Sequence, residues 1–501
     1  MLRVLALVPA GFWLLMVLLP PVNHDVAAVF DFSRRWLAGE RLYVDLFDVN
    51  PPLIFMLNLV PAAIAAWTPV GPVAALVGSL VLLAAGLWCL AEALRRGRPE
   101  GPVEAALLTA AIPALMLMAG TDFGQREAIM AMAAIPYALL VARRMDACPP
   151  SRGLALGVAV VAALAFALKP QFLVVPLLVE GLVVMRRGWE RALRDPVPWT
   201  MAAVWVAYVA VVVLAFPAYA GHVLPLAFAH YDAIQGTGPW HLLITEQMGT
   251  ALLLLGVTLP LAMLRRAGTL AQALACCTVG AFIIAWAQQK GWSYHILPVT
   301  LLGLATALVL AARWADAALP AARARAAAPG LAAVLVFAAS LHLIRGGETP
   351  WRQLWFEREQ VGQMAAWLRR DAMGARILLI SPDIFPAHGA MLHAGARPVA
   401  RMMSTWLLQG IYRDCPPGPA PYTAPEAMDP AETFVFAAYA EDLARHMPDA
   451  VLVSRHTNVR ACGGRFDLLA YFTRNPVFAA SWSQYRLVGE NGGYRLFLRR
   501  T

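Results

Sequence analysis

The sequence predicts a polytopic α-helical membrane protein with a C-terminal soluble α/β domain, and three observations lead to this fold class. Residues of the set AVILMFWYC make up 60% of the 501 residues, and charged residues only 14%. Soluble domains average about 45–50% apolar and about 25% charged residues, so the excess apolar surface must face lipid. The mean hydropathy of +0.61 agrees with this. After residue 344 charges become regular and Gly and Pro increase, which indicates a domain outside the membrane.

Apolar runs along the first part of the chain are candidates for transmembrane helices, which need roughly 20 apolar residues. Eleven such runs are present, at 4–20, 72–92, 104–119, 128–142, 154–168, 171–185, 198–216, 247–264, 269–288, 296–312 and 329–344. No small-residue cleavage site follows the first run, so we expect an uncleaved helix there. The segment 50–67 is also apolar, and counting it as a span would move every later loop to the opposite side of the membrane.

The distribution of Lys and Arg decides this question, because these residues are enriched on the cytoplasmic side. If 50–67 lies in the membrane interface, sixteen cations share the side of Arg3 and only six lie opposite, namely Arg34, Arg35, Arg41, Arg126, Lys169 and Lys290. We therefore expect about eleven spans, with the N-terminus inside, a membrane module over 1–344 and an outer domain over 345–501. The net charge of +9 comes from these short clusters, so we expect no nucleic-acid partner.

The outer domain is predicted to be α/β because short apolar stretches alternate with helical patterns. Strands are expected at 376–381 and 449–454, and helices at 352–372 and 463–473. Cys415 and Cys462 lie in this domain. An oxidising compartment permits a disulfide between them, although the sequence does not show whether they are close enough. No metal-protease, P-loop or dinucleotide-binding motif occurs in a sequence context that would support its function.

The loop after the first span is predicted to form two helices in the membrane interface. Apolar residues over 26–38 recur at offsets of three and four, with charges on the remaining face, as in a helix that lies flat at a membrane surface. Gly39 is placed to end this helix. A second helix is expected from Asn50 to Trp67, with Asn50 as its cap and proline in its first turn.

Two outer loops carry acidic residues that are candidates for chemistry. Asp25 follows the first span, and Asp122 lies in a very short loop after the third. Either carboxylate alone could simply cap a helix N-terminus. The predicted topology places both at the same membrane face, which favours a shared functional site. Glu180 lies inside an apolar run, so it must be protonated or paired.

Lysine usage points to a phosphorylated ligand at the same face. The chain has 40 Lys plus Arg residues, and only Lys169 and Lys290 are lysines. Both fall at the outer ends of predicted spans. Lysine offers a compact point charge that suits a phosphate, whereas the alternative is that each side chain only reaches toward the interface. Tyr294 and His295 lie close to Lys290 in the sequence.

The order of these features resembles the GT-C superfamily of integral membrane glycosyltransferases, in the branch of protein O-mannosyltransferases and aminoarabinose transferases. The resemblance runs from about residue 20 to residue 310. It rests on Asp25 after the first span, the surface helix, the stretch 39–45 followed by Asn50-Pro51-Pro52-Leu53, and the acidic loop at 122–127. It implies a polyprenyl-phosphate sugar donor and a glycan, lipid or protein acceptor at the periplasmic face of the bacterial inner membrane.

The resemblance also implies roles for individual residues. Asp25 would be the general base, and Asp122 would orient the acceptor or the base. Lys290, His295 and Lys169, with Tyr294 beside them, would hold the donor phosphate. Support of the acceptor and its loops would fall to His24, Gln125, Arg126, Glu127, Asp45 and Asn50. His24-Asp25 stands where some relatives have two adjacent acids, so the resemblance leaves open whether Asp25 and Asp122 hold Mg²⁺ or Mn²⁺.

The same residues suit one type of glycosyl transfer. An acceptor hydroxyl needs a base, which contributes typically about 10²–10⁴-fold, and a phosphate leaves without an acid. Fixed cations stabilise the charge that develops on it. One base with cations predicts direct displacement with inversion. The alternatives are a transporter or flippase of a polyprenyl-linked lipid, which needs no base, and a surface-polysaccharide polymerase or ligase.

Overall fold

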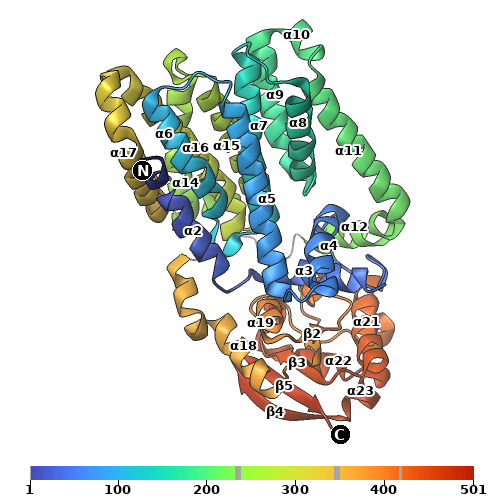
Figure 1. Cartoon of the computed structure of the whole chain (residues 1–501). Coiled ribbons are helices and arrows are strands. Elements are labelled where there is room, and N and C mark those ends of the chain that lie inside the picture. The colour runs from blue at the N-terminus through green and yellow to red at the C-terminus, as the bar shows by residue number, and fades with distance from the viewer. Residues whose placement is uncertain (1, 232–237, 344–349, 417–419, 501) are drawn as a thin grey trace. The chain divides into compact units, whose positions relative to one another are not determined.

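The computed structural model of the chain describes residues 2–231, 238–343, 350–416 and 420–500. Its Cα positions group into two compact units. The first unit consists of 1–20, 77–210 and 237–354, and the second of 21–76, 211–236 and 355–501. The boundary between them crosses helices α5 (Pro72–Arg95) and α11 (Pro196–Ala215) (Figure 1). The predicted domain boundary at 344/345 lies outside the described residues, and the division into 1–344 and 345–501 stays a prediction.

A helix occupies each of the eleven predicted apolar runs. Besides α5 and α11, these are α2 (Val8–Leu18), α6 (Pro102–Leu117), α7 (Arg126–Met145), α8 (Arg152–Phe166), α9 (Val174–Arg187), α14 (Glu246–Met263), α15 (Thr269–Gln288), α16 (Ser293–Ala318) and α17 (Ala321–Leu343). Among the described residues, five of them (α5, α7, α11, α15 and α16) are long and apolar enough to cross a membrane. The other six are shorter or less uniformly apolar, so the number of spans stays a prediction.

Helix α7 is the central element of the first unit. Nearly all of its side chains are buried, and it packs against α15 and α16. Close packing also joins α15 to α9. A Cβ added at Gly280 would lie only 2.9 Å from Cα of Val175, so this approach of the two helices requires glycine.

Glu180, which the sequence places inside an apolar run, is paired, and this is one of the two outcomes that the sequence allows. Its Oε1 and Oε2 accept hydrogen bonds from the Arg144 guanidinium at 2.6 and 2.8 Å, and the Tyr137 hydroxyl donates to Oε1 at 2.7 Å. Arg144 Nε also donates to Asp195 at 2.8 Å, and Asp195 accepts from Arg187 at 2.6 Å. These ion pairs hold α7, α9 and the start of α11 together.

The second unit contains a five-stranded sheet with the order β2-β1-β3-β5-β4. Strands β1 (Arg376–Ile380), β2 (Arg397–Pro398) and β3 (Ala450–Ser454) are parallel, and β5 (Tyr494–Arg499) runs antiparallel between β3 and β4 (Tyr485–Asn491). The predicted strands at 376–381 and 449–454 are therefore confirmed. The hairpin of β4 and β5, which turns at Gly492 and Gly493 with positive φ, was not predicted.

Helices cover both faces of this sheet (Figure 1). Helices α18 (Gln360–Asp371) and α19 (Ala387–Ala394) pack on the face that carries Ile377, Leu379 and Leu452. The other face packs against α23 (Pro476–Trp482), where the ring of Trp482 lies 4.7 Å from that of Phe497. The remaining helices of this part of the chain are α20 (Trp406–Ile411), α21 (Pro430–His446) and α22 (Leu468–Phe472). Cys415 and Cys462 form a disulfide.

The two predicted interface helices belong to this second unit. Helix α3 (His24–Leu37) ends just before Gly39, as predicted, and α4 (Pro52–Trp67) follows it. The prediction that Asn50 caps α4 is wrong. Pro51 is the capping residue, and the Asn50 amide instead donates to Asp48 at 2.7 Å. A carboxylate two residues back is the nearer partner, so it takes the amide from the helix end.

Helix α3 packs on α19 of the C-terminal part of the chain. The backbone N–H of Val22 donates to Nε2 of His393 at 3.0 Å, and a Cβ at Gly389 would lie 3.2 Å from the carbonyl oxygen of Val22. His388 is buried on α19 and its Nε2 bonds to the carbonyl oxygen of Met403 at 2.9 Å. The start of α3 therefore rests on the α/β domain.

The buried imidazole of His388 is expected to make stability depend on pH. Burial lowers the pKa of His388 from 6.5 to about 4, although its bond to Met403 acts in the opposite direction. The unfolded chain then binds more protons between about pH 6.5 and 4, so unfolding becomes easier as the pH falls. Replacing His388 with Gln should reduce the fall in the free energy of unfolding over this pH range by roughly 2–3 kcal/mol. Denaturant unfolding of the full chain across this pH range measures it, and equal slopes for wild type and H388Q would contradict the assignment.

Candidate functional site

One end of the first unit brings together four of the predicted site residues. Glu127 lies in the first turn of α7, and its Oε1 is 2.5 Å from Nζ of Lys169 and 3.6 Å from Nε2 of His295. The Lys169 ammonium also lies 5.8 Å from the centre of the Tyr294 ring. These residues come from three separate segments of the chain. We call Glu127, Lys169, Tyr294 and His295 the Glu127 cluster.

A second contact ties the loop between α6 and α7 to the start of α16. The hydroxyl of Ser293 donates to Oδ2 of Asp122 at 2.9 Å. Asp122 ends the short 3₁₀ helix η1 (Gly120–Asp122), and Gly120 and Gly124 around it have φ values of +59° and +93°. Glycine adopts such angles without strain. The loop can therefore turn tightly and present Asp122 to α16.

Three further predicted residues are buried at the same end. Gln125, Arg126 and Lys290 are 1%, 6% and 8% exposed, and Nη2 of Arg126 donates to Oε1 of Gln125 at 3.4 Å. The charges of Arg126, Lys169 and Lys290 all act on the imidazole of His295. Three cations thus act on His295, and one of them, Lys169, is paired with the Glu127 carboxylate. Helices α7 and α16 both begin here, and helix N-termini attract anions, so this end of the unit suits a negatively charged group.

Two buried polar atoms of the Glu127 cluster have no hydrogen-bond partner within the described part of the chain. They are Oε2 of Glu127 and Nδ1 of His295. More than about 90% of buried polar groups in proteins are paired with protein or water. Each atom would be satisfied by a water molecule or a ligand group beside it.

The predicted base Asp25 lies in the second unit, in the first turn of α3. The side chain of Asn23 accepts the backbone N–H groups of Asp25 and Val26 at 2.9 and 3.4 Å and so caps this helix. The imidazole of His24 packs edge-to-face on the ring of Phe385 at 5.2 Å. Asp25 is half-buried, and its charge acts on His388. The convergence of Asp25 with Asp122 stays a prediction.

Asp45 and Asn50 stabilise the connection between α3 and α4. Asp45 accepts hydrogen bonds from the backbone N–H and Nε of Arg41 at 2.9 and 3.0 Å, and this guanidinium lowers the pKa of the carboxyl group. The carbonyl oxygen of Asn50 accepts from the hydroxyl of Tyr43 at 2.5 Å. These contacts are local, so they support the predicted role in holding the loop and give no sign of contact with a substrate.

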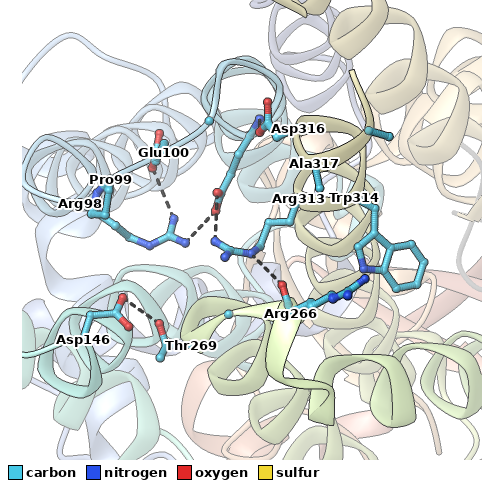
Figure 2. A pocket seen from close by; sticks show the side chains of 14 residues that line it. Arg98, Pro99, Glu100, Asp146, Arg266, Thr269, Arg313, Trp314, Asp316 and Ala317 are labelled. Carbon is cyan, nitrogen blue, oxygen red and sulfur yellow. Dashed lines mark hydrogen bonds and ion pairs between the residues drawn. The ribbon is translucent and has the colours of Figure 1, made fainter. Parts of the chain in front are cut away.

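Figure 2 shows a pocket where α6 begins and α7 ends, which is the opposite end of these helices from the Glu127 cluster. Glu104 pairs with Arg98 at 2.7 Å and with Arg313 at 3.4 Å. Asp316 accepts the backbone N–H groups of Val103 and Glu104 at 2.8 and 2.9 Å and so caps α6. The charges in this pocket pair across α6 and α16, so they explain the local structure without a ligand.

The described residues contain no group of three or more His, Cys, Asp or Glu side chains that could hold a metal ion. Within the first unit, the nearest approach to such a group is Glu127 with His295, and Lys169 occupies the same carboxylate oxygen. These residues do not fit a metal site by themselves. The expectation of Mg²⁺ or Mn²⁺ at Asp25 and Asp122 stays a prediction.

Two residues of this end are not among the predicted site residues, although the sequence places Trp292 in the polar and aromatic run that surrounds Lys290. Ser293 binds Asp122, and the indole of Trp292 lies 5.3 Å from the His295 ring. Both stand between Lys290 and Tyr294 in the sequence. The polar and aromatic run around Lys290 is the sequence signal for this segment, and no local pattern pairs Ser293 with Asp122.

No family model matches the sequence, and no curated protein matches it. Two crystal structures of ArnT from Cupriavidus metallidurans match nearly the whole chain. The one bound to undecaprenyl phosphate has a TM-score of 0.55 and 14% identity, and the match covers 99% of this chain and 97% of that chain. The apo structure has a TM-score of 0.51 and 13% identity, with 97% and 95% covered. ArnT is a GT-C aminoarabinose transferase, so the predicted GT-C fold is confirmed.

The ion pair of Glu127 and Lys169 is expected to be strongly coupled, because both side chains are almost fully buried. E127Q or K169M alone leaves the partner's charge buried and should cost about 3–5 kcal/mol of stability. The double variant should cost less than the sum by about 1–3 kcal/mol. Thermal unfolding of the purified full chain measures this coupling. The exposed pair Arg370 and Asp371 is the matched control, with R370M and D371N. Additive effects of E127Q and K169M would contradict the pairing.

Proposed function

We propose that this protein is an inverting glycosyltransferase that moves a sugar from a polyprenyl-phosphate donor to an acceptor hydroxyl at the periplasmic face of the bacterial inner membrane. The observation that carries the proposal is the full-length likeness to ArnT, one structure of which binds undecaprenyl phosphate. The cation-rich end of the first unit supports it independently, since this is the chemistry that a lipid phosphate requires.

In the proposed reaction the donor phosphate is held by Lys290, Lys169 and Arg126. Their charges stabilise the negative charge that develops on the phosphate oxygen as the bond to the anomeric carbon breaks. Glu127 holds Lys169 in place, with its Oε1 2.5 Å from Nζ of the lysine. The N-terminal turns of α7 and α16 add positive electrostatic potential. The phosphate leaves as an anion, so this side of the reaction needs no general acid.

The proposed role of Asp25 is to take the proton of the acceptor hydroxyl as the oxygen attacks the anomeric carbon. A single displacement of this kind inverts the configuration at that carbon. Asn23 fixes the backbone around Asp25, because it caps the helix at this residue. Orientation of the acceptor is the proposed role of Asp122, which Ser293 holds at 2.9 Å.

The proposed donor also accounts for the distribution of cations. Polyprenyl-linked sugars are used at the outer face of the inner membrane, and Lys169, Lys290 and Arg126 all fall on the face that the Lys and Arg count assigns to the outside. A transporter of the same lipid would bind its phosphate with the same cations. The general base Asp25 therefore distinguishes a glycosyltransferase from a transporter, because a transporter needs no base.

Replacement of Asp25 with Asn should abolish sugar transfer and leave donor binding largely intact, because the amide keeps the shape but cannot accept the proton. The loss should be at least about 10²-fold. Transfer from undecaprenyl-phosphate sugars to envelope extracts, and binding of undecaprenyl phosphate by the same preparation, measure the two properties. D371N removes a partly exposed carboxylate at the end of α18, in the second unit, and is the matched control. Turnover by D25N close to that of wild type would remove Asp25 from the role of base.

Replacement of Lys290 with Ala should weaken donor binding by roughly tenfold or more, since a charge-assisted hydrogen bond contributes about 1.5–3 kcal/mol. Titration with undecaprenyl phosphate measures the affinity. R194A removes an exposed cation on the opposite predicted side and should bind normally. Equal affinity of K290A and wild type would contradict the phosphate assignment. Mass spectrometry of lipids that co-purify with the wild type would identify the sugar.

A further inference from the structure

The carboxyl ends of the parallel strands β1 and β3 meet at a point where the chain reverses its winding. From β1 the chain leaves through α19 to β2 on one side, and it returns through α21 to β3 on the other side of β1. In open α/β sheets, ligands bind outside the carboxyl ends of the strands at such a switch point. The residues that follow β1 and β3 are therefore candidates for a binding site.

Two serines, one directly after β1 and one at the end of β3, form the same type of hydrogen-bonded turn. The hydroxyl of Ser381 accepts from the backbone N–H of Asp383 at 3.3 Å and donates to its carbonyl oxygen at 2.8 Å. The hydroxyl of Ser454 makes the same pair of bonds with His456, at 3.1 and 2.9 Å. Each turn fixes the residue two positions after the serine. Asp383 and His456 are thereby held at the same edge of the sheet.

These two side chains are joined by others at this edge. Asn458 donates to Oδ2 of Asp383 at 2.6 Å, and the charges of His24 and His456 act on the Asp383 carboxylate. The ring of Phe385 packs on His24 at 5.2 Å and remains 37% exposed. We call His24, Asp383, Phe385, His456 and Asn458 the carboxyl-edge cluster. His456 and Asp383 are exposed, and Asn458 and His24 are half-buried.

The cluster borders Asp25. His24 precedes Asp25 in the first turn of α3, and His388 on α19 interacts electrostatically with both residues. All of these residues belong to the second unit, so this neighbourhood does not depend on the placement of the other unit. A molecule bound at the cluster would lie beside the residue that is proposed to remove its proton.

We propose that the carboxyl-edge cluster binds the acceptor and that the acceptor presents carbohydrate hydroxyl groups to it. This inference rests on the proposed function, because it takes Asp25 as the base. A carboxylate, an amide and two imidazoles supply both hydrogen-bond donors and acceptors, as adjacent sugar hydroxyls require. The exposed ring of Phe385 offers an apolar face for the C–H groups of a sugar.

The surroundings favour a sugar over other acceptors. Arg455, which precedes His456, is bound to Glu490 at 2.9 Å, so its charge is already paired beside the cluster. A peptide commonly binds in extended form along a strand edge, whereas this cluster lies at the ends of two central strands. The observed set of planar polar groups with one aromatic ring fits a carbohydrate.

Saturation-transfer NMR of the full-length protein in nanodiscs tests the inference, with neutral methyl glycosides and a short Ser/Thr-rich peptide as probes. Nanodiscs avoid the sugar headgroups of maltoside detergents. We expect saturation transfer to at least one glycoside, and D383N and N458A should weaken its binding by about fivefold or more. H456N serves the same purpose if D383N does not fold. E490Q, which breaks only the pair with Arg455, is the matched control and should bind normally.

The outcomes separate the inference from the proposed function. No transfer to any glycoside at millimolar concentration, equal binding by N458A and wild type, or Asn458-dependent binding of the peptide in place of a glycoside would each overturn the inference. Undecaprenyl phosphate binding is measured on the same samples. If the lipid binds and no glycoside does, the inference alone fails. If a glycoside binds in an Asn458-dependent way and the lipid does not, the proposed donor fails.

Discussion

An ionised side chain cannot be buried among apolar helices without a partner, and this constraint organises the first unit. Its buried charges occur in pairs or small networks that join different helices. Arg144 with Glu180 and Asp195 connects α7, α9 and the start of α11, and Glu104 with Arg98 and Arg313 connects α6 and α16. At the remaining end, Glu127 pairs with Lys169, and the charges of Arg126, Lys169 and Lys290 all act on His295. This gathering of positive charge is what makes that end suitable for an anionic ligand.

Much of the fold follows from the sequence because the apolar period and the turn residues are local signals. Helices occupy all the predicted apolar runs, Gly39 ends α3, and strands form at 376–381 and 449–454. The failed cap at Asn50 shows the limit, since a competing carboxylate two residues away cannot be weighed from propensity alone. The hairpin of β4 and β5 was missed because its alternating pattern is weak at an exposed edge, with most β4 side chains exposed.

The candidate site was predicted less completely, for a physical reason. The sequence identifies the rare lysines, but the pairing of Lys169 with Glu127 joins residues 42 positions apart, and no local pattern encodes it. The same holds for Ser293 and Asp122, which are 171 positions apart. Hydropathy distinguishes segments that face lipid from segments that face water. The two compact units, in contrast, are defined by which residues contact one another in the folded chain. Hydropathy therefore could not show that the first loop, which carries Asp25, packs with the C-terminal sheet.

That packing has a consequence for how the protein is made. The second unit is assembled from residues 21–76, 211–236 and 355–501, so its first segment leaves the ribosome long before its last. Helix α3 has no α19 to pack on until about four fifths of the polypeptide has been synthesised. Contacts of such large sequence separation form slowly. A chain that terminates before α19 leaves this face of the amphipathic α3 without its packing partner.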